Sequence, residues 1–396
     1  MVVAQDVDVE PVEGNRRLFE GWRYFVIAGL AVVYALFHMA ALNGLSLEEL
    51  TGISVPFLPS FPLETWNFRM VHIAGALALG FLLFAAYRFP SKSDGDSAPG
   101  KPGVLTIASA LLIIPVIISA WTAIGFISFL QSDQPIEMLG RAAWVSMAGQ
   151  VPDAFASYSD IYSREFYWYG IPLLMATFGA IIIGWFERRD RSRFAASDII
   201  LALCGLVVAL YLIPIYETNA RNQVGTPNVA IGVAFAATAG SALILELTRR
   251  VAGLALVVIT GVFLVYTFTA HLLPGILSID NPYTWHRFFG HVYSDAGILG
   301  PTTAVSSTYI ILFIIFAAFL QASKVGDYFV NFAFAAAGRA RGGPAKVAIF
   351  ASGLMGMING TSAGNVVATG SLTIPLMKKV GYNSKTAGAI EAGAST

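Results

Sequence analysis

Amide, hydroxyl and glycine residues interrupt an apolar stretch near the C-terminal end of the sequence. The run 359–365, Asn-Gly-Thr-Ser-Ala-Gly-Asn, separates apolar pieces at 345–358 and 366–377. Side-chain oxygens and free carbonyls are ligands that hard cations prefer, and glycine frees the backbone to present them. Secondary transporters bind sodium and anionic substrates at such broken helices. The residues predicted to bind sodium or substrate are Asn359, Gly360, Thr361, Ser362 and Asn365.

Basic residues flank this interrupted stretch on both sides. Arg339, Arg341 and Lys346 precede it, and Lys378 and Lys379 follow it. Because basic residues stay on the cytoplasmic side, both ends of the stretch are predicted to lie there. The pattern indicates a re-entrant helical hairpin over 345–379, with its tip inside protein or a water-filled cavity. The alternative is a single long kinked span whose small residues pack against neighbouring helices.

The composition is typical of a multi-span membrane protein. Apolar residues make up 56% of the 396 residues and charged residues only 12%, against about 25% charged in soluble domains. The net charge of zero gives no reason to expect a nucleic acid partner. We predict an all-α integral membrane protein, because helices satisfy their own backbone in lipid. The predicted spans are 22–42, 70–87, 104–130 (with a kink at Pro115), 168–186, 198–216, 228–247, 251–271 and 303–322.

The basic residues also predict the orientation. With the N-terminus in the cytoplasm, 19 of the 24 Lys and Arg residues fall on the cytoplasmic side. Residues 1–21 are then a polar cytoplasmic tail, and nothing in them has the pattern of a signal peptide. Residues 325–338 carry apolar side chains at helical spacing and predict an amphipathic helix on the cytoplasmic face, in contact with lipid.

Three strings carry a family resemblance: RGGPAK at 341–346, GMINGTSAGNVVATGSLTIPLMKKVGY at 356–382 and AGAIEAGAST at 387–396. They resemble the large membrane subunit of tripartite ATP-independent periplasmic (TRAP) transporters, most closely the fused permeases that work with TAXI-type binding proteins. The strings LELTRRVAG at 245–253 and RMVHIAG at 69–75 resemble further parts of those permeases.

The resemblance implies a plan for the whole chain. Residues 22–247 would be small-subunit-like scaffold helices, and 248–396 the first part of the large-subunit transport domain. The resemblance further implies import of a small organic acid anion, of the carboxylate or dicarboxylate class, across a prokaryotic inner membrane. Sodium would drive an elevator movement, and an extracytoplasmic TAXI-type binding protein would deliver the substrate.

The sequence departs from that family in three ways. Six predicted spans precede Glu246 where four are expected, so 89–197 is interpreted as a two-span insertion. Asn359 stands where the family has serine, and its side-chain carbonyl can still bind a cation. The inverted second half, with its own hairpin, is expected beyond residue 396, so this chain is expected to hold about half a site. The alternative is a non-transporting scaffold subunit or remnant of such a permease.

Other polar residues are weaker candidates. Thr369, Gly370 and Ser371 lie on the return helix of the predicted hairpin, and Ser395 and Thr396 are predicted to line the same cavity. The structural alternative is that these small residues satisfy helix ends and allow close packing.

Ionisable residues elsewhere have simpler interpretations. Glu246, which precedes two arginines, is interpreted as one side of an interfacial ion pair. Two cofactor sites are considered only as alternatives: a haem site at His38 and His72, and a metal site at His286, His291 and Asp295. No nucleophile elbow, phosphate loop or zinc pattern indicates an enzyme.

Overall fold

The computed structural model describes residues 15–44, 65–87, 104–130, 164–187, 191–216, 229–279, 283–323, 325–359 and 362–396. Within these ranges every regular element is a helix, and one isolated bridge joins Arg16 to Phe84. The chain divides into two compact units. Unit 1 is Met1–Tyr34 with Leu58–Ala304, and unit 2 is Ala35–Phe57 with Val305–Thr396.

Eight helices in the described ranges are long and apolar enough to cross a membrane, and each overlaps one predicted span. They run Trp22–Asn43, Thr65–Leu83, Val104–Gly125, Glu165–Phe186, Ala196–Tyr216, Ile231–Val251, Leu254–Leu272 and Pro301–Phe319. The predicted all-α membrane fold is therefore confirmed. The second helix begins at Thr65 rather than at residue 70. The prediction starts late because the polar Asn67 and Arg69, which belong to the helix, interrupt the apolar run. The predicted insertion at 89–197 and the predicted domain boundary near 247 stay predictions.

The third span is interrupted one turn before Pro115. Helix α4 ends at Leu111 and α5 begins at Ile113. Proline has no N–H to bond the carbonyl four residues earlier, which weakens the helix at this point. The Leu112 N–H instead donates to the Ser109 carbonyl at 3.1 Å, a tighter three-residue turn. The interruption agrees with the predicted kink.

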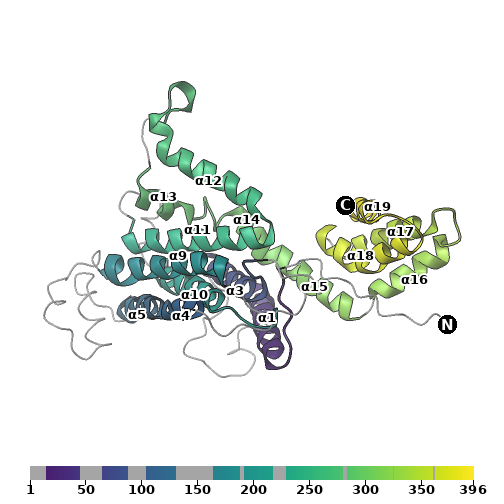
Figure 1. The fold of residues 1–396 in the computed structure, drawn as a ribbon, viewed down its shortest axis with the longest axis horizontal. Helices are drawn as coiled ribbons and strands as arrows, with labels where there is room; N and C mark the ends of the chain where they lie inside the picture. Colours follow the sequence, from purple (N-terminus) through teal and green to yellow (C-terminus); the bar gives the residue numbers. More distant parts are fainter. Residues whose placement is uncertain are drawn as a thin grey trace. The chain divides into compact units, whose positions relative to one another are not determined.

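Unit 1 is a helical bundle (Figure 1). Its longer helices are α1 (Trp22–Asn43, as far as Tyr34), α3 (Thr65–Leu83), α4 (Val104–Leu111), α5 (Ile113–Leu130), α9 (Ile171–Phe186), α10 (Ala196–Tyr216), α11 (Ile231–Val251), α12 (Leu254–Thr269) and α13 (Trp285–Val292), with a π-helical turn η2 (Glu165–Gly170) before α9. Helix α10 packs against α3, α5 and α9, and α11 packs against α9 and α13. The two spans of the predicted insertion therefore belong to the same core as α10. Helix α12 projects from the bundle with no buried residue.

Unit 2 contains the predicted amphipathic helix and the predicted hairpin. Its helices are α15 (Ile311–Ala322), α16 (Val325–Ala337), α17 (Gly343–Asn359), α18 (Ser362–Lys379) and α19 (Ser384–Ala394). Helix α16 packs on α17 through Val330, Ala333 and Ala337, whereas its Phe332 is exposed.

An ionic cluster of five side chains lies at one end of unit 1: Arg17, Asp198, Glu246, Arg249 and Arg250. Arg250 joins the two acids, with Nη1 2.6 Å from Asp198 Oδ1 and Nε 2.8 Å from Glu246 Oε1. Arg17 pairs with Asp198, and Arg249 binds both Glu246 oxygens. Because each buried acid has an arginine, the charges are tolerated in the apolar bundle. The predicted ion pair of Glu246 is confirmed.

The same arginines bind the C-terminal end of α3. Arg17 donates to the carbonyls of Phe81 and Leu82, and Arg250 donates to the Phe84 carbonyl at 2.9 Å. The last carbonyls of a helix have no partner within it and carry a partial negative charge. The ionic cluster therefore holds α3, α10 and α11 together at this end.

Two buried glutamates at the ends of the fourth span accept hydrogen bonds from the two helices that follow it. Glu165, at its start, accepts hydrogen bonds from the Gly232 N–H at the start of α11 and from the Tyr211 hydroxyl. Glu187, just after its end, accepts from the backbone N–H groups of Ala196 and Ser197 at the start of α10. A carboxylate suits a helix N-terminus because the free N–H groups and the dipole are positive there.

We expect Glu187→Ala to lower the free energy of unfolding by about 1–3 kcal/mol, because buried N–H and hydroxyl donors lose their charged acceptor. Thermal unfolding of the purified protein in detergent measures this change. The matched control is Glu20→Ala, an exposed glutamate in unit 1, which should change stability by less than about 0.5 kcal/mol. Equal melting temperatures for the two variants would contradict the capping role.

Candidate functional site

The helices α17 and α18 fold back on each other as an antiparallel hairpin, within the group of helices α16–α19 in Figure 1. Near the connection, the Asn365 Nδ2 donates to the Ser352 carbonyl at 2.9 Å. At the other end, Ala348 packs with Met377. The helical hairpin is thus present in the described residues, and its predicted re-entrant position in the membrane stays a prediction.

The chain then turns into α19 through two defined caps. Gly381 has a φ of +99°, and the Tyr382 N–H donates to the Met377 carbonyl at 3.1 Å. This is the Schellman arrangement, in which glycine takes the left-handed conformation after a helix. The Asn383 side chain then accepts from the Thr386 N–H at 2.7 Å and begins α19. These caps bring α19 back against both arms of the hairpin.

A buried carboxylate lies where the three helices meet. Glu391 of α19 is fully buried, and its oxygens accept hydrogen bonds only from hydroxyl groups in the described residues. Oxygen Oε1 accepts from Ser352 of α17 at 2.8 Å, from Thr369 of α18, and from Ser395 at 3.3 Å. Oxygen Oε2 accepts from Thr373. We call Glu391 and these four residues the Glu391 cluster.

Sequence reasoning missed Glu391, Ser352 and Thr373, although their spacing held a signal. Asn365, Thr369 and Thr373 are four residues apart, which places them on one face of α18. Glu391 and Ser395 are likewise four residues apart. Polar residues at this spacing on two helices indicate a shared buried polar site.

Near the hairpin tip, the side chain of Asn365 has an oxygen that could accept a further hydrogen bond or bind a cation. Its side chain is buried, and its amide orientation is set because the Ser352 carbonyl can only accept a hydrogen bond. The other amide atom, Oδ1, is buried with no hydrogen-bond partner among the described residues. A buried carbonyl without a partner costs about 1–3 kcal/mol, which a bound cation would offset.

The predicted site residues have different surroundings. Asn359 ends α17, and Gly360 and Thr361 lie outside the described residues. Ser362 begins α18 and is exposed. Of the weaker candidates, Thr369, Gly370 and Ser395 are buried in or beside the Glu391 cluster, whereas Ser371 and Thr396 are exposed. The structure brings together Asn365, Thr369, Gly370 and Ser395; sodium binding by the predicted set stays a prediction.

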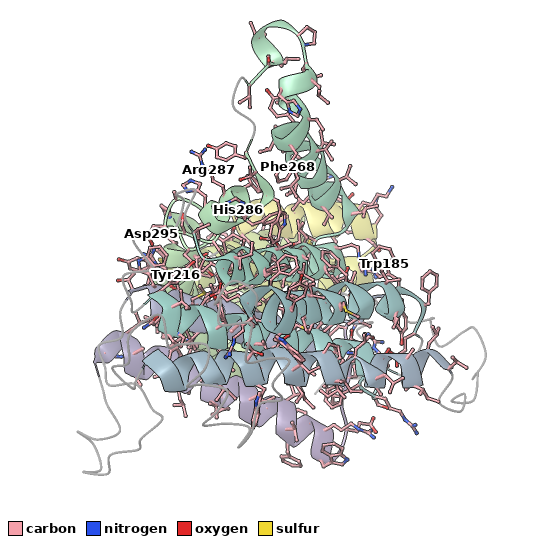
Figure 2. All side chains as sticks on the ribbon, turned by 90° about the vertical axis from the view of Figure 1, so that its left-hand side faces the viewer. Trp185, Tyr216, Phe268, His286, Arg287 and Asp295 are labelled. Atoms are coloured by element: carbon pink, nitrogen blue, oxygen red, sulfur yellow. The ribbon has the colours of Figure 1, made fainter. Side chains whose placement is uncertain are left out.

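Two residues of the alternative cofactor sites, Asp295 and His72, have other partners in the described residues. The described residues contain no group of three or more His, Cys, Asp or Glu side chains that could hold a metal. Asp295 lies 3.6 Å from Arg69 instead. In Figure 2, Asp295 and Tyr216 lie at the opposite end of the bundle from Trp185. The Nδ1 of His72 is 2.9 Å from the Tyr34 hydroxyl, an ordinary hydrogen bond between spans.

The hairpin and the Glu391 cluster fall within the part of the chain that matches a known family. Residues 239–396 match the family model described as the tripartite ATP-independent periplasmic transporter, DctM component. Searches of curated proteins and of solved structures found no match. The DctM component is the large membrane permease of these transporters, which work with a dedicated extracytoplasmic binding protein, and it is not an enzyme family. The matched region includes α12 and α15–α19, so the candidate site is part of the DctM-like region.

We expect the close packing of α18 on α19 to be disturbed by any side chain at Gly370. A Cβ at this position would lie 3.1 Å from Glu391 Cγ and 3.3 Å from Ile374 Cδ1. We expect Gly370→Ala to destabilise the protein by about 1 kcal/mol or more, because overpacking outweighs the helix propensity of alanine. Melting temperature in detergent is the measurement.

The matched control for this substitution is Gly388→Ala in α19. A Cβ there would have no atom within 4 Å. This variant should be neutral, or more stable by up to about 1 kcal/mol. A Gly370→Ala protein that melts no lower than the control would contradict the close packing.

Proposed function

We propose that this chain is the permease component of a sodium-driven secondary transporter that imports a small organic acid anion delivered by an extracytoplasmic binding protein of the TAXI type. The family match over 239–396 carries the proposal. The helical hairpin supports it, because broken helices are where secondary transporters bind sodium and anions. The predicted elevator movement and the prokaryotic inner membrane location are part of the same proposal.

The residues proposed to bind sodium are those of the predicted hairpin tip. Asn359, Gly360, Thr361 and Ser362 supply backbone and side-chain oxygens, and Asn365 supplies Oδ1. The buried Oδ1 without a hydrogen-bond partner among the described residues supports Asn365 in particular. Sodium is a hard cation and prefers such neutral oxygen ligands.

We expect Asn365→Ala to weaken sodium binding about tenfold, because it removes one charge-assisted oxygen contact. Binding of radioactive sodium to the purified full-length protein, measured by scintillation proximity, gives the affinity. The matched control is Asn383→Ala, which removes the cap of α19 but no proposed ligand. That control should bind sodium as the unsubstituted protein does, although it loses about 1 kcal/mol of stability. Equal affinities in both variants would remove Asn365 from the site.

Transport itself is tested in proteoliposomes that contain the full-length permease and its extracytoplasmic partner. Radiolabelled succinate serves as the dicarboxylate probe, with an inward gradient of either sodium or potassium. The expected result is uptake that needs both the sodium gradient and the partner. Uptake at the same rate under the potassium gradient would refute sodium coupling.

A further inference from the structure

Glu391 differs from the other buried acids in the kind of group that binds it. The described residues hold five buried carboxylates. Asp198 and Glu246 bind arginines, and Glu165 and Glu187 each accept from backbone N–H groups. These donors cannot accept a hydrogen bond, so they favour the ionised carboxylate. The hydroxyls around Glu391 can donate or accept. Its partners can therefore also accept a hydrogen bond from a protonated carboxyl.

The two oxygens of Glu391 have unequal partners. Oε1 accepts from three hydroxyls, whereas Oε2 accepts only from Thr373. The Thr373 hydroxyl has a second acceptor within reach, the Thr369 carbonyl at 3.0 Å. Its hydrogen can therefore turn away from Glu391 without losing a hydrogen bond.

We propose that Glu391 is a proton-binding site in the hairpin unit. A proton adds to Oε2 and forms an O–H bond, and the side chain changes from charge −1 to neutral. The new O–H donates to Thr373 Oγ1, and the Thr373 hydrogen turns to the Thr369 carbonyl. The three hydrogen bonds at Oε1 stay in place, so both protonation states fit the same packing.

No fixed charge in the described residues holds Glu391 in one state. The helices packed against α19 are α17 and α18. Their basic residues, together with Lys385 of α19 itself, are exposed and form no ion pair with Glu391: Lys346, Lys378, Lys379 and Lys385.

Infrared difference spectroscopy of the purified full-length protein in lipid nanodiscs tests the proposal. The carbonyl stretch of a protonated carboxylic acid is followed from about pH 9 down to about pH 4. Exposed carboxyls also protonate toward pH 4 in both proteins, so the expected result is an acid band in the unsubstituted protein that is missing from Glu391→Gln. The glutamine amide copies the shape and donor position of the protonated carboxyl, so this variant should fold. Identical difference spectra for the two proteins would overturn the proposal.

Two threonine variants test the role of Thr373. They also provide a test of the proposal that does not depend on whether Glu391→Gln folds. Thr373→Val removes the acceptor of the new O–H bond, so the acid band should move to higher frequency. Thr386→Val is the matched control, because its side chain is exposed on α19, and it should leave the band unchanged. A band that does not move in Thr373→Val would refute the proposed rearrangement. The readout needs neither sodium nor transport, so it fails or succeeds independently of the proposed function.

Discussion

The burial of carboxylates in apolar helices is the constraint on which both units depend. An ionised carboxylate without partners in such surroundings costs several kcal/mol, so every one must meet converging donors. In unit 1 these donors are arginines and helix N-termini. In the described part of unit 2 they are hydroxyls alone. The first arrangement fixes the charge and joins helices permanently, whereas the second joins helices and leaves the charge free to change.

The carboxylates of unit 1 also explain how the spans within 89–197 belong to its core. Glu165 and Glu187 lie at the two ends of one span and bind the N-termini of α11 and α10. Ser109 of α4 donates to Glu187 as well, at 3.2 Å. These spans thus supply caps that α10 and α11 do not contain themselves. If 89–197 is an insertion, the helices that it joined have come to depend on it.

Hydropathy and charge were sufficient to predict the eight spans and the hairpin, because both follow from residue type along the chain. The predicted start of α3 is too late, because the polar Asn67 and Arg69 lower the hydropathy at its N-terminal end. Asn67 is nevertheless buried by tertiary packing. The Glu391 cluster was not predicted, since its members come from three helices. Ser352 and Glu391 are 39 residues apart, and only the fold of α19 onto the hairpin brings them into contact.

Two residues connect the proposed proton site to the proposed sodium ligand. Ser352 donates its hydroxyl to Glu391 and accepts the Asn365 amide at its carbonyl. The Thr369 hydroxyl donates to Glu391, and its Oγ1 lies 2.9 Å from the backbone carbonyl oxygen of Asn365. A change in the charge of Glu391 therefore acts on the groups that orient Asn365. If proton binding alters sodium affinity through these contacts, sodium binding must alter proton affinity by the same factor, because linkage between two binding sites is reciprocal.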